Sequence, residues 1–275
     1  MNAERKLAQL VQADIKIEQA TIGRFRINYV SAGSGPAVIL LHGANIGWGQ
    51  WYPNIAALAQ YFTVYAIDLP GAGGSSKIAF HTANLEKDFV DTVDSFIKDR
   101  RLSKVHIIGH SLSGWIALKL ALREAPYLDK IVLVDSLGLT DYMPWRYRLL
   151  SFRIFATVLS KTVMRPTKAN MSKFLTDVLY GAPVLPEEFV EYFYESIHRE
   201  KLSHPFMLFH RLSGLFKIDQ ELVLIDQLSK IHHPTLIIMG EKDPLIPLKK
   251  VLKSLPLLGG ARMEIFWNTG HSPSM

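Results

Sequence analysis

The stretch KVHIIGHSLSGWIALKLAL, residues 104–122, decides the fold. Its first eight residues form an apolar run that predicts a buried strand, and the apolar positions that follow predict a helix. Ser111 lies at the tight turn between the two and is surrounded by small residues (Gly109, Ser113 and Gly114). Small side chains let the backbones of a strand and a helix approach closely. The pattern therefore predicts a strained turn that lifts a serine hydroxyl above the end of a sheet.

Apolar runs on both sides of this stretch predict a mostly parallel sheet. They are apolar continuously rather than alternately, which is typical of strands covered on both faces, and helical segments such as 84–100 separate them. Two earlier alternating runs, 14–23 and 24–33, predict an antiparallel hairpin at the edge. Alternation of strands and helices predicts an α/β fold with right-handed crossovers. The remaining predicted strands are 37–43, 62–68, 104–111, 130–136, 234–240 and 263–270.

Residues 138–216 break this alternation. Their sequence predicts no strand and instead contains helical stretches that are dense in aromatic side chains. An insertion between two buried strands, placed at their carboxyl ends, covers the crevice where ligands bind in such sheets. We therefore predict an α/β core made of residues 1–137 and 217–275, with a helical cap over 138–216.

The composition limits the class of protein. A chain of 275 residues with 48% hydrophobic content is long enough for one large core. The chain has no cysteine, which excludes disulfides, a thiolate nucleophile and zinc sites with sulfur ligands. The first residues lack the apolar core of a signal peptide, and no run approaches the roughly 18 apolar residues of a membrane span. A net charge of +6 without a nucleic-acid motif favours a mildly basic cytoplasmic enzyme that does not bind nucleic acid.

A serine hydroxyl becomes a strong nucleophile only when a base accepts its proton and a third group orients that base. His271 lies just past the last predicted strand and is the candidate base. Asp243 follows the strand 234–240 and is the candidate acid, whereas Asp135, at the end of another strand, is its rival. The chain order Ser111, Asp243, His271 is one of the known orders of serine hydrolase triads.

The other histidines are expected to have supporting roles. His42 is expected to support the loop beside it, and His110 to point off the opposite side of the turn at Ser111. No spacing among the histidines resembles a metal site, so we expect no metal, and we expect no cofactor. Five others are expected in the cap or at the other end of the sheet: His198, His204, His210, His232 and His233.

With these motifs in order, the sequence resembles the α/β-hydrolase superfamily, in its capped serine-hydrolase branch. LLHGAN (40–45) followed by Trp51 looks like the family's oxyanion loop, and DLPGAGGSS (68–76) is similar to its Asp-x-x-Gly-x-Gly-x-Ser segment. GEKDPLIP and GHSP match the acid and histidine segments, whereas Ser113 stands where the family's elbow usually has glycine. The resemblance implies an eight-stranded sheet with helices on both sides and a helical cap inserted after strand 6. It also implies oxyanion donors from the backbone N–H groups of Ala44 and Leu112.

The resemblance implies a carboxylesterase that acts on a small or medium apolar ester through an acyl-enzyme. Two alternatives share the triad. One is a carbon–carbon hydrolase of ring-cleavage products, whose cap the stretch MRPTKANMSKFLTDVLYG (164–181) resembles, although those enzymes usually carry Ser-Met-Gly-Gly at the elbow. The other is a butenolide-type receptor that hydrolyses its ligand slowly and resembles this chain in Gly-His-Ser-x-Ser. The residues expected to line the substrate pocket are Trp48, Trp115, Trp145 and Leu245.

Charge in the cap raises a second expectation. Between Tyr142 and Lys173 there is no acidic residue, whereas seven residues are basic. Such a stretch is usually a solvated face, but next to aromatic side chains it is also compatible with weak contact to an anionic membrane. The seven basic residues are Arg146, Arg148, Arg153, Lys161, Arg165, Lys168 and Lys173.

The family that the sequence resembles continues into a helix after the histidine loop, whereas only SPSM follows His271 here. Apolar surface near the sheet would then stay exposed, and the loop with the base would be anchored on one side only. We therefore expect lowered stability and a weakly positioned His271.

Overall fold

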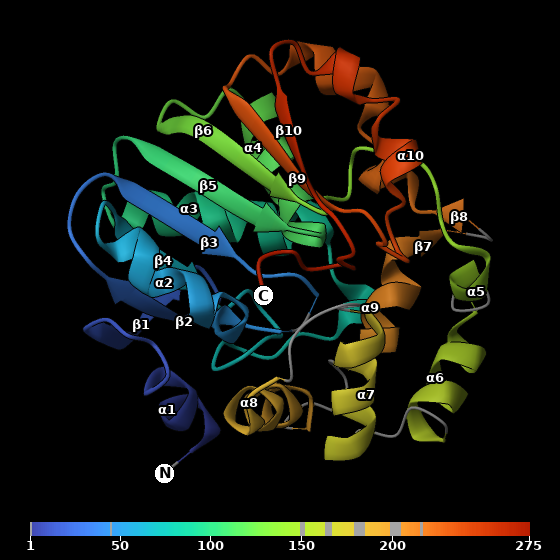
Figure 1. The fold of residues 1–275 in the computed structure, drawn as a ribbon, viewed down its shortest axis with the longest axis horizontal. Coiled ribbons are helices and arrows are strands. Elements are labelled where there is room, and N and C mark those ends of the chain that lie inside the picture. The colour runs from blue at the N-terminus through green and yellow to red at the C-terminus, as the bar shows by residue number, and fades with distance from the viewer. Residues whose placement is uncertain are drawn as a thin grey trace.

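A computed structural model describes residues 2–44, 46–148, 152–162, 167–178, 185–198, 205–214 and 217–275. Eight strands form one sheet in the order β1-β2-β4-β3-β5-β6-β9-β10 (Figure 1). Neighbouring strands from β4 to β10 are parallel, whereas β2 is antiparallel to both β1 and β4. This is the predicted sheet, with its hairpin at the edge. Its strands are β1 (Ile15–Ile22), β2 (Phe25–Ala32), β3 (Ala37–Leu41), β4 (Thr63–Ile67), β5 (Val105–His110), β6 (Leu128–Val134), β9 (Thr235–Gly240) and β10 (Arg262–Phe266).

Helices cover both faces of the sheet, and each face has its own apolar core. Side chains of α3 and α4 pack against one face, and those of α1, α2 and the cap helix α8 pack on the other side (Figure 1). The predicted helix 84–100 begins with a π-helical turn over Glu86–Val90 before α3. The core helices are α1 (Ala3–Ala8), α2 (Tyr52–Ala59), α3 (Asp91–Asp99), α4 (Leu112–Leu122) and α10 (Leu248–Val251).

The strands are covered less evenly than their apolar sequences predict. All five residues of β3 are buried, as expected for a strand with helices on both sides. In β5, β6 and β9, however, Ile108, Val132 and Ile238 are only half-buried and pack at the margin of the core formed by α1 and α2. One face of these three strands is thus partly open. The prediction of full cover was wrong there, because the packing of α1 and α2 does not extend fully across them.

Helix α1 joins the sheet to the cap, and the sequence analysis did not predict it. Asn2 caps the helix by accepting a hydrogen bond from the N–H of Arg5. Glu4 accepts hydrogen bonds from the Asn28 amide at 2.7 Å and from the Trp48 indole at 2.9 Å. Lys6 forms an ion pair with Glu191 of α8 at 2.8 Å. A six-residue helix thus contacts three distant parts of the chain.

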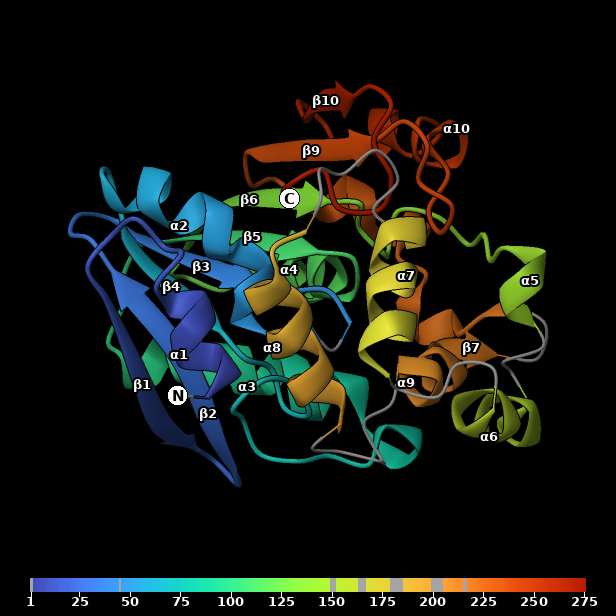
Figure 2. The same ribbon diagram turned by 60° about the horizontal axis from the view of Figure 1, so that its bottom comes forward.

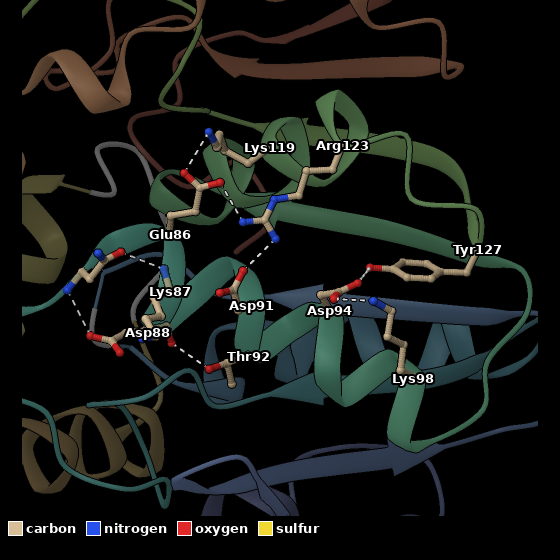
Figure 3. A network of polar contacts seen from close by, with 11 residues as sticks. Glu86, Lys87, Asp88, Asp91, Thr92, Asp94, Lys98, Lys119, Arg123 and Tyr127 are labelled. Atoms are coloured by element: carbon tan, nitrogen blue, oxygen red, sulfur yellow. Dashed lines mark hydrogen bonds and ion pairs between the residues drawn. The ribbon is translucent and has the colours of Figure 1, made fainter.

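Ion pairs on the protein surface link α4 to the helical segment before it (Figure 3). Glu86 forms ion pairs with Lys119 of α4 and with Arg123, the residue directly after α4. Arg123 also forms an ion pair with Asp91 at 2.7 Å. Exposed pairs of this kind each contribute roughly 0–1 kcal/mol. They join the far end of α4, the helix that begins directly after Ser111, to that preceding segment.

Helices follow β6 and precede β9, where the cap is predicted (Figure 2). Helix α8 contacts α1 and α7, and α6 contacts α9. A two-residue pairing between β7 (Ser213–Gly214) and β8 (Lys217–Ile218) lies at the predicted end of the cap, where no strand is predicted. The helices within the predicted cap are α5 (Trp145–Arg148), α6 (Arg153–Lys161), α7 (Lys168–Val178), α8 (Glu187–His198) and α9 (Pro205–Leu212). The domain limits at 138 and 216 stay predictions, and residue 216 lies outside the described residues.

Candidate active site

Ser111 occupies the predicted strained turn between β5 and α4. Its backbone has φ 55° and ψ −116°, a conformation that residues other than glycine rarely adopt. Hydrogen bonds hold the turn: the Ser111 N–H donates to the Val134 carbonyl at 2.9 Å, and its own carbonyl accepts from Leu137 at 3.0 Å. A Cβ on Gly109 would collide with the Ser113 carbonyl oxygen. The small residues of the motif are thus required by the close approach of the two backbones.

Ser113, which replaces the usual glycine of the motif, fits this site because its hydroxyl has a partner. The side chain is fully buried, and its Oγ donates a hydrogen bond to the His42 carbonyl. A buried hydroxyl without a partner would cost free energy, whereas this one links α4 to the loop after β3. The departure from the motif therefore leaves the turn intact.

His271 and Asp243 lie together at the carboxyl end of the sheet, in the loops after β10 and β9. The Nδ1 of His271 donates to Asp243 Oδ2 at 2.7 Å, and both side chains are buried. Asp243 Oδ1 accepts from the N–H groups of Leu245 and Ile246 at 2.7 and 3.0 Å. With its Nδ1 proton directed to the carboxylate, His271 presents Nε2 as an acceptor.

Ser111 and His271 are both described, and no hydrogen bond joins them in this structure. Such contacts are often long before substrate binds. The expectation of a loosely held His271 does not agree with this geometry. Asp243 accepts a hydrogen bond from the His271 ring, and the backbone carbonyl of His271 accepts one at 3.2 Å from His110 Nε2. Near this loop Phe266 and Trp267 are exposed.

The structure corrects the expected direction of His110. This side chain was expected to point away from the site, but it is buried with its ring centroid 4.7 Å from that of His271. The reason is that the loop after β10 crosses the end of β5, so the two histidines meet. Burial and the neighbouring His271 hold the pKa of His110 well below its usual range. His110 is therefore a neutral packing partner of His271 at neutral pH.

His42 supports the loop after β3. Its Nε2 accepts the N–H of Leu69 at 3.0 Å, so its Nδ1 carries the proton and donates to the Gly43 carbonyl. Burial lowers the pKa of His42 to about 4, which keeps the ring neutral over most of the pH range. The ring thereby fixes the backbone immediately before Ala44.

Gln50, which the sequence analysis missed, connects the same loop to the histidine loop. Its Oε1 accepts the N–H of Gly43 at 2.8 Å, and its Nε2 donates to Ser272 Oγ at 3.3 Å. The side chain is fully buried. The sequence has no signal that would have indicated it, since long polar side chains are seldom fully buried.

The two backbone groups expected as oxyanion donors lie after β3 and at the start of α4. Ala44 follows β3 in the loop fixed by His42 and Gln50, and it is half-buried. Leu112 is the first residue of α4, and the N–H groups in the first turn of a helix have no partner within that helix. A helix N-terminus also favours negative charge. The role of both groups as oxyanion donors stays a prediction.

The predicted pocket residues do not form one group. Trp48 and Trp115 are fully buried in the two cores, where their indole N–H groups donate to Glu4 and to the Glu221 carbonyl. Neither indole is free to line an open pocket, so this expectation is corrected: both face inward from helical turns that pack on the sheet. Trp145 is 71% exposed on α5, and Leu245 is half-buried beside Asp243. Of the four, Leu245 alone adjoins the triad candidates.

Asp68 organises the loop that the DLPGAGGSS segment forms. It is fully buried and accepts hydrogen bonds from the N–H groups of Trp48 at 2.6 Å and Gly74 at 2.8 Å, and from the Asn28 amide at 2.8 Å. The Tyr192 hydroxyl of α8 lies 3.4 Å from the same carboxylate. Burial raises the pKa of Asp68 to about 7, although these donors oppose the shift. Asp68 thus shapes the loop and contacts the cap.

One group of buried side chains in the described part of the chain has metal-ligating atoms close together. The ligand atoms of His110, Asp135 and His271 lie within 4.8 Å of one another. Hydrogen bonds already involve His110 Nε2, His271 Nδ1 and Asp135 Oδ1. Each of the three side chains is thus held by a hydrogen bond within the site, while His110 Nδ1 and Asp135 Oδ2 have no partner among the described residues, and we assign no metal to the cluster.

The geometry defines a hydrolase scaffold with a serine at its strained turn, and the comparisons agree. The model of the Alpha/beta hydrolase family matches residues 38–275. The chain belongs to this family and is a hydrolase.

Two relatives show how varied the similar enzymes are. A 2-hydroxy-6-oxo-6-phenylhexa-2,4-dienoate hydrolase of Comamonas testosteroni is 27% identical over 93% of this chain and 88% of its own. A pimeloyl-[acyl-carrier protein] methyl ester esterase of Nitrosomonas europaea is 28% identical over 90% of this chain and 93% of its own. Among solved structures, a putative lipase of Acinetobacter baumannii has a TM-score of 0.80 at 23% identity, over 100% of this chain and 91% of that chain. This last likeness shows the fold.

Proposed function

We propose that this protein is a serine esterase that cleaves a small or medium apolar ester with Ser111, Asp243 and His271. The observation that carries the proposal is the 2.7 Å hydrogen bond from His271 to Asp243 beside the strained turn of Ser111. A serine, a histidine and a carboxylate at the ends of three different strands form the arrangement that activates a hydroxyl.

The reaction follows from these positions. The Ser111 hydroxyl attacks the ester carbonyl while His271 Nε2 accepts its proton, and Asp243 stabilises the imidazolium. The oxyanion of the tetrahedral intermediate accepts hydrogen bonds from the N–H groups of Ala44 and Leu112. Collapse of the intermediate breaks the ester C–O bond, and His271 returns the proton to the leaving alcohol. Water then attacks the acyl-enzyme by the same route, releases the acid and restores Ser111.

A second candidate is cleavage of a carbon–carbon bond in a ring-cleavage product. It rests on the 27% identity to the dienoate hydrolase. The 28% identity to a methyl ester esterase supports the first candidate to the same degree, so identity alone does not separate the two. The elbow sequence Ser-Leu-Ser-Gly distinguishes this chain from the Ser-Met-Gly-Gly expected of the carbon–carbon hydrolases. We therefore place the ester reaction first.

Labelling and turnover test the proposal together. A fluorophosphonate probe is expected to label the wild-type chain once and Ser111→Ala not at all. Nitrophenyl esters of several chain lengths and a 2-hydroxy-6-oxo-dienoate are then compared as substrates. Turnover of the esters supports the esterase, preference for the dienoate supports the second candidate, and labelling with almost no turnover indicates a slow receptor. Labelling or turnover by Ser111→Ala at the wild-type level would contradict the assigned nucleophile.

A further inference from the structure

Asp135 is a buried carboxyl group that the proposed mechanism does not use. It follows β6 directly, has no exposed surface, and has a left-handed backbone with φ 40°. Residues other than glycine rarely adopt this conformation, and such strain occurs often at functional sites. A fold that needed only a turn here would be better served by glycine. The side chain is therefore the feature that requires an explanation.

The Asp135 carboxyl group is only half satisfied by the fold. Its Oδ1 accepts the N–H of Gly240 at 2.9 Å, whereas its Oδ2 is buried with no hydrogen-bond donor in the described part of the chain. Buried polar atoms almost always have a partner, because an unpaired one costs free energy. The exception lies beside the triad candidates.

Three side chains from three different elements face the Asp135 carboxyl group. Asp243 lies in the loop after β9 and is its charged neighbour. His110 at the end of β5 and His271 in the loop after β10 have ring nitrogens within 4.8 Å of it. Both histidine rings and both carboxyl groups are thus packed into one buried cluster.

Two buried carboxylates in contact cannot both be ionised at low cost. Burial and the charge of Asp243 raise the pKa of Asp135 well above its usual range. Asp243 instead has two backbone N–H donors and the His271 Nδ1 proton, all of which stabilise its charge. The proton of the pair therefore resides on Asp135, and its free Oδ2 is the atom that can donate it.

We propose that Asp135 is a positioning residue and a reserve acid of the triad. As a neutral acid it donates a hydrogen bond to Asp243 and holds that carboxylate toward His271. When residue 243 carries no charge, Asp135 releases its proton to solvent and its carboxylate orients His271 instead. This inference rests on the proposed function, because it assigns a role relative to the same histidine.

A double-mutant cycle tests the reserve role. The four proteins are wild type, Asp135→Asn, Asp243→Asn and the double variant, each assayed for kcat and KM on a nitrophenyl ester from pH 6 to 9. Loss of a triad aspartate typically lowers kcat about 10⁴-fold. We expect Asp243→Asn to lose less than that, and the double variant to lose at least tenfold more than the product of the two single losses. The fall is expected in kcat rather than KM, because His271 orients a proton transfer.

The pH profile provides a readout that a purely structural role would not change. In Asp243→Asn the turnover is expected to rise with pH as Asp135 ionises, and this limb should be absent from the double variant. Asp88→Asn in the same Asp243→Asn background is the control, since Asp88 is also a buried carboxylate but bonds to Arg24 away from the site. Its effect is expected to be additive. Urea denaturation of every variant verifies that each one folds.

Two outcomes separate this inference from the proposed function. If Asp243→Asn and the double variant have equal turnover and equal pH profiles, Asp135 supplies nothing and the reserve role is wrong. In that case a loss of all labelling in Ser111→Ala still leaves the esterase proposal in place. If Ser111→Ala itself retains full turnover, the proposed function fails whatever the cycle shows.

Discussion

Replacing Gln50 by leucine should loosen the oxyanion loop and the histidine loop at once. Leucine has nearly the same volume but makes neither of the two hydrogen bonds of the amide, to Gly43 and to Ser272. The N–H of Gly43 would then be buried without an acceptor, which costs about 1–3 kcal/mol. Ser272 Oγ retains a contact with Ser274 Oγ at 3.4 Å, so its share of the loss is smaller. We therefore expect the free energy of unfolding to fall by about 2–3 kcal/mol.

The effect on turnover follows from the neighbouring residue. Complete loss of an oxyanion donor lowers kcat by about 10²–10³-fold. Gly43, which loses its hydrogen bond in Gln50→Leu, directly precedes Ala44, so the variant should displace the Ala44 N–H but not remove it. We therefore expect a smaller loss, of about 10- to 100-fold in kcat, and a small change in KM. Urea denaturation and the hydrolysis of a nitrophenyl ester measure the two quantities. Gln60→Leu, at an exposed position after α2, is the matched control. A Gln50→Leu protein with wild-type stability and wild-type kcat would refute this reasoning.

Three further predictions concern a hydroxyl, an ionisation and a surface. Ser113→Gly restores the usual motif but removes the hydrogen bond to the His42 carbonyl, so urea denaturation should show a loss of about 1–2 kcal/mol; a gain would show that the bond does not stabilise the turn. Because burial lowers the pKa of His42 from 6.5 to about 4, the unfolded chain binds the extra proton between these values. The contribution of the neutral His42 ring to the free energy of unfolding is therefore complete above pH 6.5. It is lost, by up to about 3 kcal/mol, as the pH falls toward 4. The raised pKa of Asp68 changes stability with pH in the opposite direction, so the contribution of His42 is isolated by comparing the unfolding of wild type with that of His42→Gln. An equal pH dependence in these two proteins would contradict the lowered pKa of His42. Finally, Ile154 and Val158 of α6 are 77% and 52% exposed within the basic part of the predicted cap. We therefore expect the protein to co-sediment with phosphatidylglycerol vesicles, and this binding should weaken at high salt and in the variant with serine at both positions. Equally negligible binding to phosphatidylcholine and phosphatidylglycerol vesicles would exclude membrane contact.

The sequence predicted the sheet because its strands are strongly apolar and are separated by amphipathic segments. All eight strands lie within a few residues of their predicted limits, and the turn at Ser111 has the predicted strain. Short local patterns determine these features, so no knowledge of distant contacts is needed. The same reasoning does not find α1, because its six residues depend on contacts with Asn28, Trp48 and Glu191.

The candidate site could be predicted only in part. Asp135 and Asp243 both follow buried strands, so a linear pattern cannot decide which carboxylate meets His271. The direction of His110 and the bridge made by Gln50 depend on loops that cross the end of the sheet, and their sequences contain no signal for that crossing. The wrong expectation for Trp48 and Trp115 has a similar cause, since an aromatic side chain near a site motif can face the core as readily as the substrate.

The contacts of α1 have a practical consequence for anyone who modifies this chain. Glu4 is bonded to the sheet and to the loop after β3, and Lys6 is bonded to α8 of the cap. A fluorescent dye attached at these first residues would sense displacement of α8 from the core. An affinity tag fused there could strain the same contacts, so a tag and its cleaved product should be compared before rates are assigned to the native enzyme.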